Sequence, residues 1–292
     1  MIAGLINRMH TTSEDRIMKV FISVDMEGVA CVTHGDHVKL EGPAYEEARK
    51  WMTGEAKAAI LGAKEAGASE IVVADGHGHM HNLIPEALPE DISLIQGVPR
   101  TLLMMGGIDG SYDAAMFIGY HARAGDAYGT LAHSFSGRLV SEVRLNGEAV
   151  SEAVFNAAVA GHFGVPLVLV SGDDQLGEEI AARLPWAERV ITTRALSATA
   201  ARTLTPQAAQ TAIQEAARRA LERLKSMRPL ELETPVEFEV EFRSPMSAML
   251  AADIPGVERR EARRLFYAAH DMLEASRIWR LMLNVCMGEA QV

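Results

Sequence analysis

The chain has 292 residues, of which 48% are hydrophobic and 23% charged, close to the averages for soluble globular proteins. This length allows one large domain or two ordinary ones, and the composition excludes extensive disorder. The formal net charge of −11 argues against nucleic acid as a partner, because binding phosphates requires a positive surface. It is compatible with binding metal ions or substrates that carry a free ammonium group.

Cysteine content and apolar run lengths indicate the compartment. Only Cys31 and Cys286 occur, far apart, which excludes a thiol-rich zinc site and a disulfide scaffold. No apolar run approaches the ~20 residues that a membrane helix requires. Residues 1–17 lack a long apolar segment and a small-residue cleavage site, so they predict a flexible extension rather than a secretion signal. We expect a cytoplasmic protein with no membrane partner.

Short apolar runs alternate with polar clusters and helical patterns along the first two thirds of the chain. The runs that predict buried strands are 19–24, 70–74, 114–120, 166–172 and 189–193. A helical pattern over 43–66 begins with a proline, which suits a first helical turn. Apolar strands that alternate with helices predict an α/β fold, with a doubly wound, mostly parallel sheet flanked by helices.

A different pattern follows the third predicted strand. Residues 138–150 predict a β-hairpin insertion around Asn146 and Gly147, a pair that favours tight hairpin turns. The next helix is expected over 151–162, with Ser151 as its N-terminal cap.

The character of the sequence changes after residue 197. A long helical pattern covers 206–226, an alternating strand pattern covers 235–242, and a further helix is expected over 259–280. We therefore predict a catalytic α/β domain over 18–197 and a smaller α+β domain over 198–292. The smaller domain is expected to take part in oligomerisation.

Polar side chains follow the predicted strands at their carboxyl ends, where open α/β sheets bind ligands. Asp25 and Glu27 follow the first strand and can face one side, although Asp25 could equally cap a turn with Glu27 solvated. His77, His79 and His81 follow the second strand. His77 lies closest to the strand end and is the favoured ligand, whereas the other two are expected to be surface histidines.

Further candidates follow the third and fourth strands. His121 lies one residue beyond a strand, His133 opens the hairpin segment, and Glu152 lies in the first turn of a helix. Each has an ordinary explanation, as a hydrogen-bonded structural histidine or as an acid that suits the helix dipole. Asp173 and Asp174 are expected to be helix caps.

Taken together, carboxylates and histidines without cysteine are typical of a hydrolytic rather than a structural zinc site. Three carboxylates and two neutral imidazoles would be nearly neutralised by two divalent ions and one hydroxide. A single ion would leave the cluster negatively charged, which is costly for a buried site. The candidate set therefore favours two ions.

Six motifs in order resemble those of the D-aminopeptidases of the DppA type, which are two-metal zinc peptidases. They are SVDMEG (23–28), DGHGHMHN (75–82), GYHARAG (119–125), AHSFSG (132–137), LNGEAVSEAVFNAAVAG (145–161) and LVSGDD (169–174). The resemblance implies that the metal ligands are Asp25, Glu27, His77, His121 and Glu152. It also implies that His133 is catalytic, that two zinc ions bind each subunit, and that the subunits form a ring-like homo-oligomer such as a decamer.

Some positions depart from the family pattern. Gly76 stands where serine is frequent, and Ser151 where glycine is usual. Thr193 and Ala198 occupy places where the family often has lysine and arginine. If those bases hold the substrate in other members, the substrate of this chain differs from theirs.

The leading hypothesis is a zinc-dependent aminopeptidase that removes the N-terminal residue of short peptides, with the preference for D-residues that the resemblance implies. Attack would come from a metal-activated hydroxide or with the assistance of His133. One alternative is a metal-dependent amidase or an L-selective peptidase on the same scaffold. Another is a non-catalytic peptide-binding protein linked to peptide transport, against which the complete set of catalytic residues argues.

Overall fold

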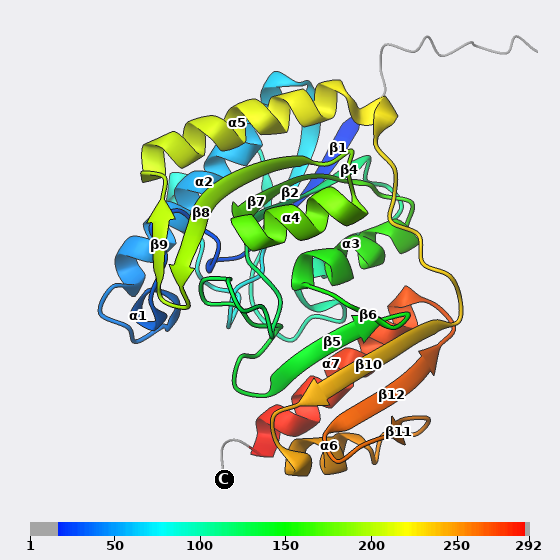
Figure 1. Ribbon diagram of the computed structural model, residues 1–292. Coiled ribbons are helices and arrows are strands. Elements are labelled where there is room, and N and C mark those ends of the chain that lie inside the picture. The colour runs from blue at the N-terminus through cyan, green and yellow to red at the C-terminus, as the bar shows by residue number, and fades with distance from the viewer. Residues whose placement is uncertain (1–16, 290–292) are drawn as a thin grey trace, which may run out of the picture.

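The computed structural model describes residues 17–289, so the expected extension over 1–17 lies outside the described residues apart from Ile17. Two sheets organise this part of the chain (Figure 1). The larger has seven strands in the order β3-β2-β1-β4-β7-β8-β9, and the smaller has five in the order β11-β12-β10-β5-β6. The predicted α/β class with a mostly parallel, helix-flanked sheet is confirmed.

All strands of the larger sheet are parallel except β9, which pairs antiparallel with β8. Their bounds are β1 (Met18–Val24), β2 (Ala68–Asp75), β3 (Ser93–Ile95), β4 (Ala114–Tyr120), β7 (Leu167–Asp173), β8 (Glu188–Ser197) and β9 (Ala200–Thr203). From β1, the chain adds β2 and β3 on one side and β4, β7 and β8 on the other. The order therefore reverses between β1 and β4, and such a switch point is where open sheets bind ligands.

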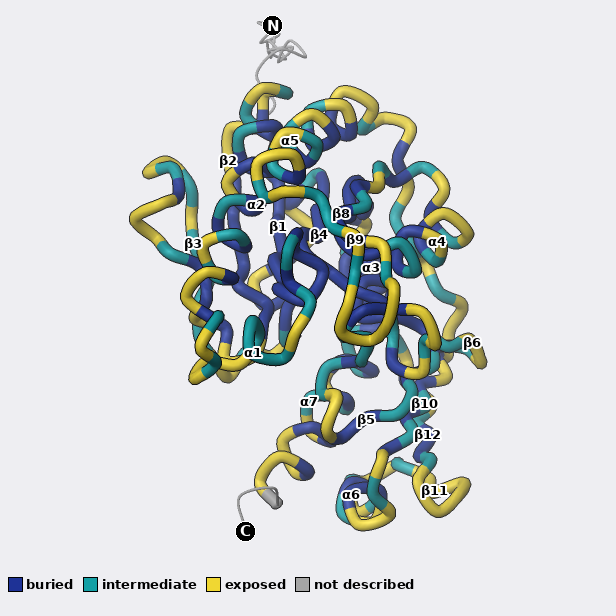
Figure 2. The backbone as a smooth tube through the Cα atoms, turned by 60° about the vertical axis from the view of Figure 1, so that its left-hand side comes forward, coloured by how far each residue is buried: buried dark blue, intermediate teal, exposed yellow. Residues whose placement is uncertain are grey.

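Helices cover both faces of this sheet because its strands are apolar on both sides. Val20 and Ile22 of β1 share a core with α2 (Tyr45–Glu65) and α5 (Pro206–Glu222). Phe21, between them in the sequence, faces the opposite core with α3 (Glu152–His162) and α4 (Asp174–Arg183). Figure 1 shows these two helical layers, and Figure 2 shows how completely the central strands are buried.

The smaller sheet is antiparallel, and the predicted hairpin belongs to it. Its strands are β5 (Val140–Leu145), β6 (Glu148–Ala149), β10 (Val236–Phe242), β11 (Glu258–Arg259) and β12 (Arg264–Ala269). The α6 helix (Pro245–Ala251) and α7 (Met272–Glu289) follow β10 and β12 in the sequence. The single turn α1 (Gly35–Val38) and the 3-10 turns η1 (Pro85–Ala87), η2 (Leu103–Met105) and η3 (Leu224–Ser226) complete the described elements.

Two sequence expectations differ from this arrangement. The helix predicted over 259–280 is wrong in its first half, because β11 and β12 occupy that region and α7 begins only at Met272. Pairing of β12 with β10, from Val236 opposite Ala269 onward, overrides the local helical pattern. The boundary predicted at residue 197 also differs from the division between the sheets, since β9 and α5 lie with the larger sheet and β5 and β6 with the smaller one.

The α3 helix lies between the two sheets, which explains why it is apolar on all sides. Every residue from Glu152 to Gly161 is buried, and Phe155 contacts both Phe135 and Phe238 of β10. The first turn of α3 therefore has a rigid position near the carboxyl ends of β1 and β4. No helix of the described residues is long and apolar enough to cross a membrane.

Candidate metal centre

The loop after β1 carries the first two candidate ligands and lies tightly against the end of β4. Asp25 N donates to Ile118 O at 2.8 Å, and Gly28 N donates to Gly119 O at 2.8 Å. A Cβ on Gly28 would lie 1.7 Å from Tyr120 O, so only glycine allows this approach. The loop is therefore held against β4 directly beside the candidate ligand that follows that strand.

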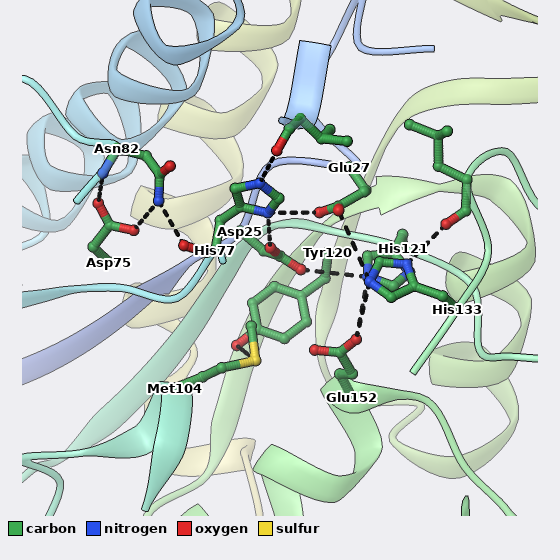
Figure 3. Close-up of polar contacts among 12 residues, drawn as sticks. Asp25, Glu27, Asp75, His77, Asn82, Met104, Tyr120, His121, His133 and Glu152 are labelled. Carbon is green, nitrogen blue, oxygen red and sulfur yellow. Dashed lines mark hydrogen bonds and ion pairs between the residues drawn. The ribbon is translucent and has the colours of Figure 1, made fainter. Parts of the chain in front are cut away.

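The five predicted ligands come together at the switch point of the larger sheet (Figure 3). His77 Nδ1 lies 3.0 Å from Glu27 Oε2 and 3.3 Å from Asp25 Oδ1. His121 Nε2 lies 3.4 Å from Asp25 Oδ2 and 3.4 Å from Glu152 Oε1. All five residues are buried. Asp25 thus links two groups of side chains, one around His77 and one around His121.

His133 closes the cluster from the side of the β4–β5 connection. Its Nε2 atom lies 3.8 Å from Glu27 Oε1 and 3.9 Å from Glu152 Oε1, and its ring stacks on His121 at 4.2 Å. Its side chain is 20% exposed, against 9% or less for the other five. Glu152 also accepts a hydrogen bond from Phe135 N at 2.7 Å, which holds the segment after His133.

Potential ligand atoms form two triads within 4.8 Å. One consists of Asp25, Glu27 and His121, and the other of His121, His133 and Glu152. His133 therefore lies within reach of a metal ion as well as of a substrate. Its assignment as a catalytic residue rather than a ligand stays a prediction.

The orientation of the three histidines is set by backbone carbonyl groups. The contacts are His77 Nε2 to Val38 O at 2.8 Å, His121 Nδ1 to Ala122 O at 2.8 Å, and His133 Nδ1 to Leu131 O at 2.9 Å. A carbonyl oxygen only accepts, so each of these nitrogens donates, and the other nitrogen of a neutral ring is left with a lone pair. That lone pair faces carboxylate oxygens in every case, which is repulsive unless a metal ion lies between them or the ring takes up a proton.

The strongest evidence that a cation binds at this site comes from His121. Its Nε2 atom is buried and has no hydrogen-bond partner within the described residues. Burial alone would lower the pKa of His121, but Asp25 and Glu152 outweigh it and raise the pKa well above its ordinary value. Neutral imidazoles backed by carbonyls, together with carboxylates, fit a zinc ion, since second-shell hydrogen bonds of this kind orient zinc-binding histidines.

Sequence comparison gives the same family as the motifs. A profile of the M55 peptidase family, described as D-aminopeptidase, matches residues 18–281. The chain belongs to this D-aminopeptidase family. The D-aminopeptidase of Bacillus subtilis (strain 168) is 32% identical over 274 residues, which cover 92% of this chain and 98% of that protein.

A solved structure agrees in fold over almost the same length. It is described as the Zn-dependent D-aminopeptidase DppA from Bacillus subtilis, a self-compartmentalizing protease, and matches with a TM-score of 0.89 at 32% identity. The match covers 92% of this chain and 98% of that one. The resemblance inferred from the six motifs is thereby confirmed, and the chain is placed among the hydrolases that act on peptide bonds.

Asp75 ends β2 but acts as an anchor for the loop that follows. Its carboxylate accepts hydrogen bonds from Asn82 N, Asn82 Nδ2 and Leu83 N. The same Asn82 amide donates to His77 O at 2.7 Å, and its oxygen accepts from Tyr45 OH at 2.7 Å. This network, shown in part in Figure 3, positions His77. Asn82 was not among the predicted site residues, although its place at the end of the DGHGHMHN motif is a signal for this role.

The remaining candidates lie outside the cluster. His79 and His81 are exposed, in keeping with their expected surface position. Asp173 is confirmed as the cap of α4, where it accepts from Leu176 N at 2.8 Å. Its other oxygen accepts from Ala122 N at 2.8 Å and so holds the residue after His121.

Proposed function

We propose that the chain is a zinc-dependent aminopeptidase that removes the N-terminal residue, preferably a D-residue, from short peptides. The observation that carries this proposal is the cluster of three buried carboxylates and three carbonyl-oriented histidines at the switch point of the sheet. Family membership and the zinc dependence of the similar DppA support the metal and the reaction. The preference for D-residues rests on the family alone.

Asp25, Glu27, His77, His121 and Glu152 are the proposed ligands of two zinc ions. Three carboxylate charges would be nearly balanced by two divalent ions and one hydroxide, so a buried site of this composition favours two ions over one. Zinc in such a site supplies Lewis-acid polarisation of a carbonyl and lowers the pKa of a bound water. The two histidine ligands need little movement, because the carbonyl groups of Val38 and Ala122 already orient their rings.

His133 is proposed to transfer the proton that the departing amine requires. Its Nδ1 donates to Leu131 O, so Nε2 faces the cluster. A cavity of 370 Å³ opens at this point and is lined by Asp25, Glu27, His77 and His133. His133 is the most exposed of the six residues, which suits a group that contacts substrate from the cavity side.

We propose a ring-like homo-oligomer, such as a decamer, built partly through the C-terminal region. Exposed large apolar side chains there include Met246 and Met249 on α6 and Leu281 and Val285 on α7. Such side chains commonly mark interfaces. The description of the similar DppA as self-compartmentalizing supports an assembly that encloses the active sites. Cys31 and Cys286 form no disulfide with each other, which agrees with the proposed cytoplasmic location.

The test loads the protein with zinc, counts the metal per subunit, and screens peptides and amides of D- and L-alanine. Two zinc ions and faster cleavage of D-alanyl peptides would support the proposal. Cleavage of L-peptides or simple amides alone would indicate the alternative hydrolases, and tight binding without turnover would indicate a peptide-binding protein. The exposed His81, changed to alanine, is the matched control for His133→Ala, because it lies outside the cluster.

A further inference from the structure

A second cavity, of 420 Å³, adjoins the metal centre. It shares Gly76, Gly78, His79, Phe135 and Glu152 with the cavity that contains the candidate ligands. Beyond this common wall it extends towards η2 and α7. A ligand can therefore lie in both cavities and cross from one to the other beside Glu152.

One face of α7 lines this second cavity. Arg280, Leu283, Asn284 and Met287 are spaced at i, i+3, i+4 and i+7, which places them on one side of a helix. The opposite wall contributes further apolar side chains, among them Met104. The cavity is thus mainly apolar, with a small number of polar groups, as is usual for sites that bind small molecules.

Two arginines in the cavity wall have buried donors without partners. Arg100 donates through Nη2 to Asp75 O, but its Nε and Nη1 atoms are buried and have no hydrogen-bond partner within the described chain. The Nε atom of Arg280 is in the same situation. Buried donors in native proteins are nearly always satisfied. These nitrogens are shielded from the cavity, but other parts of both arginines line it, and neither guanidinium has an ion-pair partner among the described residues. An anion in the cavity would supply that partner, and guanidinium groups suit a carboxylate in particular.

The backbone around the cavity is strained. Six described non-glycine residues have positive φ, and three of them line this cavity: Met80 (φ 59°), Leu103 (φ 51°) and Phe135 (φ 58°). Such conformations are unfavourable for residues with a side chain and concentrate at binding and catalytic sites. The surrounding structure therefore holds these three apolar side chains in place at a cost in stability.

We propose that the second cavity binds the C-terminal residue of a dipeptide substrate, with Arg280 and Arg100 holding its carboxylate and the apolar wall holding its side chain. This inference rests on the proposed function. The amino end of the dipeptide lies at the metal centre, and the carboxylate end lies at the arginines. The peptide bond then crosses beside Glu152, near His133. The substrate class is a dipeptide with a free carboxylate and an apolar last residue.

The test compares D-alanyl-leucine with the same dipeptide amidated at its C-terminus. With the zinc-loaded wild-type enzyme, the free acid should have a KM ~10–100-fold lower than the amide, the range expected for a charge-assisted hydrogen bond. Arg280→Met should raise the KM of the free acid by that factor and leave its kcat and the KM of the amide unchanged. The reason is that the lost interaction stabilises the bound substrate and the transition state equally. Arg280→Lys should restore part of the difference. Arg277→Met is the matched control, since Arg277 is exposed on the same helix and lies outside this cavity.

Several results would overturn the inference. Equal KM values for acid and amide in the wild type would do so, as would an equal rise for both peptides in Arg280→Met. A change in oligomer size without a change in KM would show that Arg280 pairs with a neighbouring subunit instead.

Failure of the proposed function would give a different result, namely no cleavage of either peptide by the wild type. Calorimetric binding of both peptides to zinc-loaded His133→Ala protein, with and without Arg280→Met, is a readout that does not require turnover. Tighter binding of the free acid, abolished by Arg280→Met, would uphold the inference even then. Equal binding of the two peptides would refute it.

Discussion

Glu55 is a buried acid whose replacement should change the pH dependence of stability. It lies on α2, is 1% exposed, and accepts a hydrogen bond from Ala30 N at 2.8 Å through Oε1. Its Oε2 atom is buried with no hydrogen-bond partner in the described part of the chain. Burial raises the pKa of Glu55 from 4.5 to about 8, against the smaller opposing effect of the Ala30 hydrogen bond. We therefore expect a protonated carboxyl group at neutral pH, which anchors the loop after Asp25 and Glu27.

The sign and size of the effect follow from the two pKa values. Between pH 4.5 and 8 the folded protein keeps a proton on Glu55 that the unfolded chain has lost, so stability falls as pH rises. The slope is about 1.4 kcal/mol per pH unit in the middle of this window and smaller near each pKa, so the loss between pH 5 and pH 8 is about 3.5 kcal/mol. Glu55→Gln puts a neutral amide in nearly the same space and removes this loss. Its stability relative to wild type should therefore improve by about 3.5 kcal/mol between pH 5 and pH 8.

The assay is denaturant unfolding of wild type and Glu55→Gln at one protein concentration, at pH 5, 6.5 and 8. Other titrating groups contribute equally to both proteins and cancel in the difference. Glu47→Gln, on the exposed side of the same helix, is the control and should show no such trend. The infrared band of a protonated carboxyl should also be present at pH 6.5 in wild type and missing in Glu55→Gln. A stability difference that is flat with pH, or an ionised Glu55 at pH 6.5, would refute the reasoning.

Three further predictions concern the metal centre. His77→Ala should lose zinc, whereas His79→Ala should keep its zinc and most of the activity. Elemental analysis measures the zinc content of both variants, and equal zinc contents would exclude His77 as a ligand. His133→Ala should lower turnover by ~10²–10⁴-fold with metal content and oligomer size unchanged, whereas His121→Ala should lose metal as well. Loss of metal from His133→Ala would make that residue a ligand. Chelation of the zinc should lower the melting temperature, because an ion present at 100 times its Kd stabilises the folded protein by about 2.7 kcal/mol. Added zinc should restore the original melting temperature. A melting temperature insensitive to chelation would contradict a buried metal site.

The sequence predicted the elements of the large parallel sheet well because both of its faces are covered. A strand buried on both sides, such as β4, is apolar at nearly every position, and that pattern is easily recognised in a sequence. Edge strands lack this signal. The short edge strand β9 pairs on one side only. β12 lies between β11 and β10, but its local sequence pattern is helical, and these pairings are not visible in the local sequence.

The candidate ligands were predictable for a related reason. Parallel strands end at a common edge, so Asp25, His77 and His121 had to lie near one another once the strands were recognised. Their second hydrogen bonds were not predictable. The carbonyl of Val38, which orients His77, comes from α1, and no local pattern connects that turn with the end of β2.

Arg280 shows why the second cavity could not be found without the structure. It is one of 28 basic residues, and its helical spacing with Leu283 and Met287 describes any amphipathic helix. Only the fold places α7 and η2 along one cavity, where Arg280, whose buried Nε has no hydrogen-bond partner within the described residues, lines the same space as the Glu152 that the motifs identified. The family motifs lie where the chemistry is shared by all members. The proposed carboxylate-binding residue Arg280 lies on the C-terminal helix, outside those motifs, so the motifs alone would not reveal it.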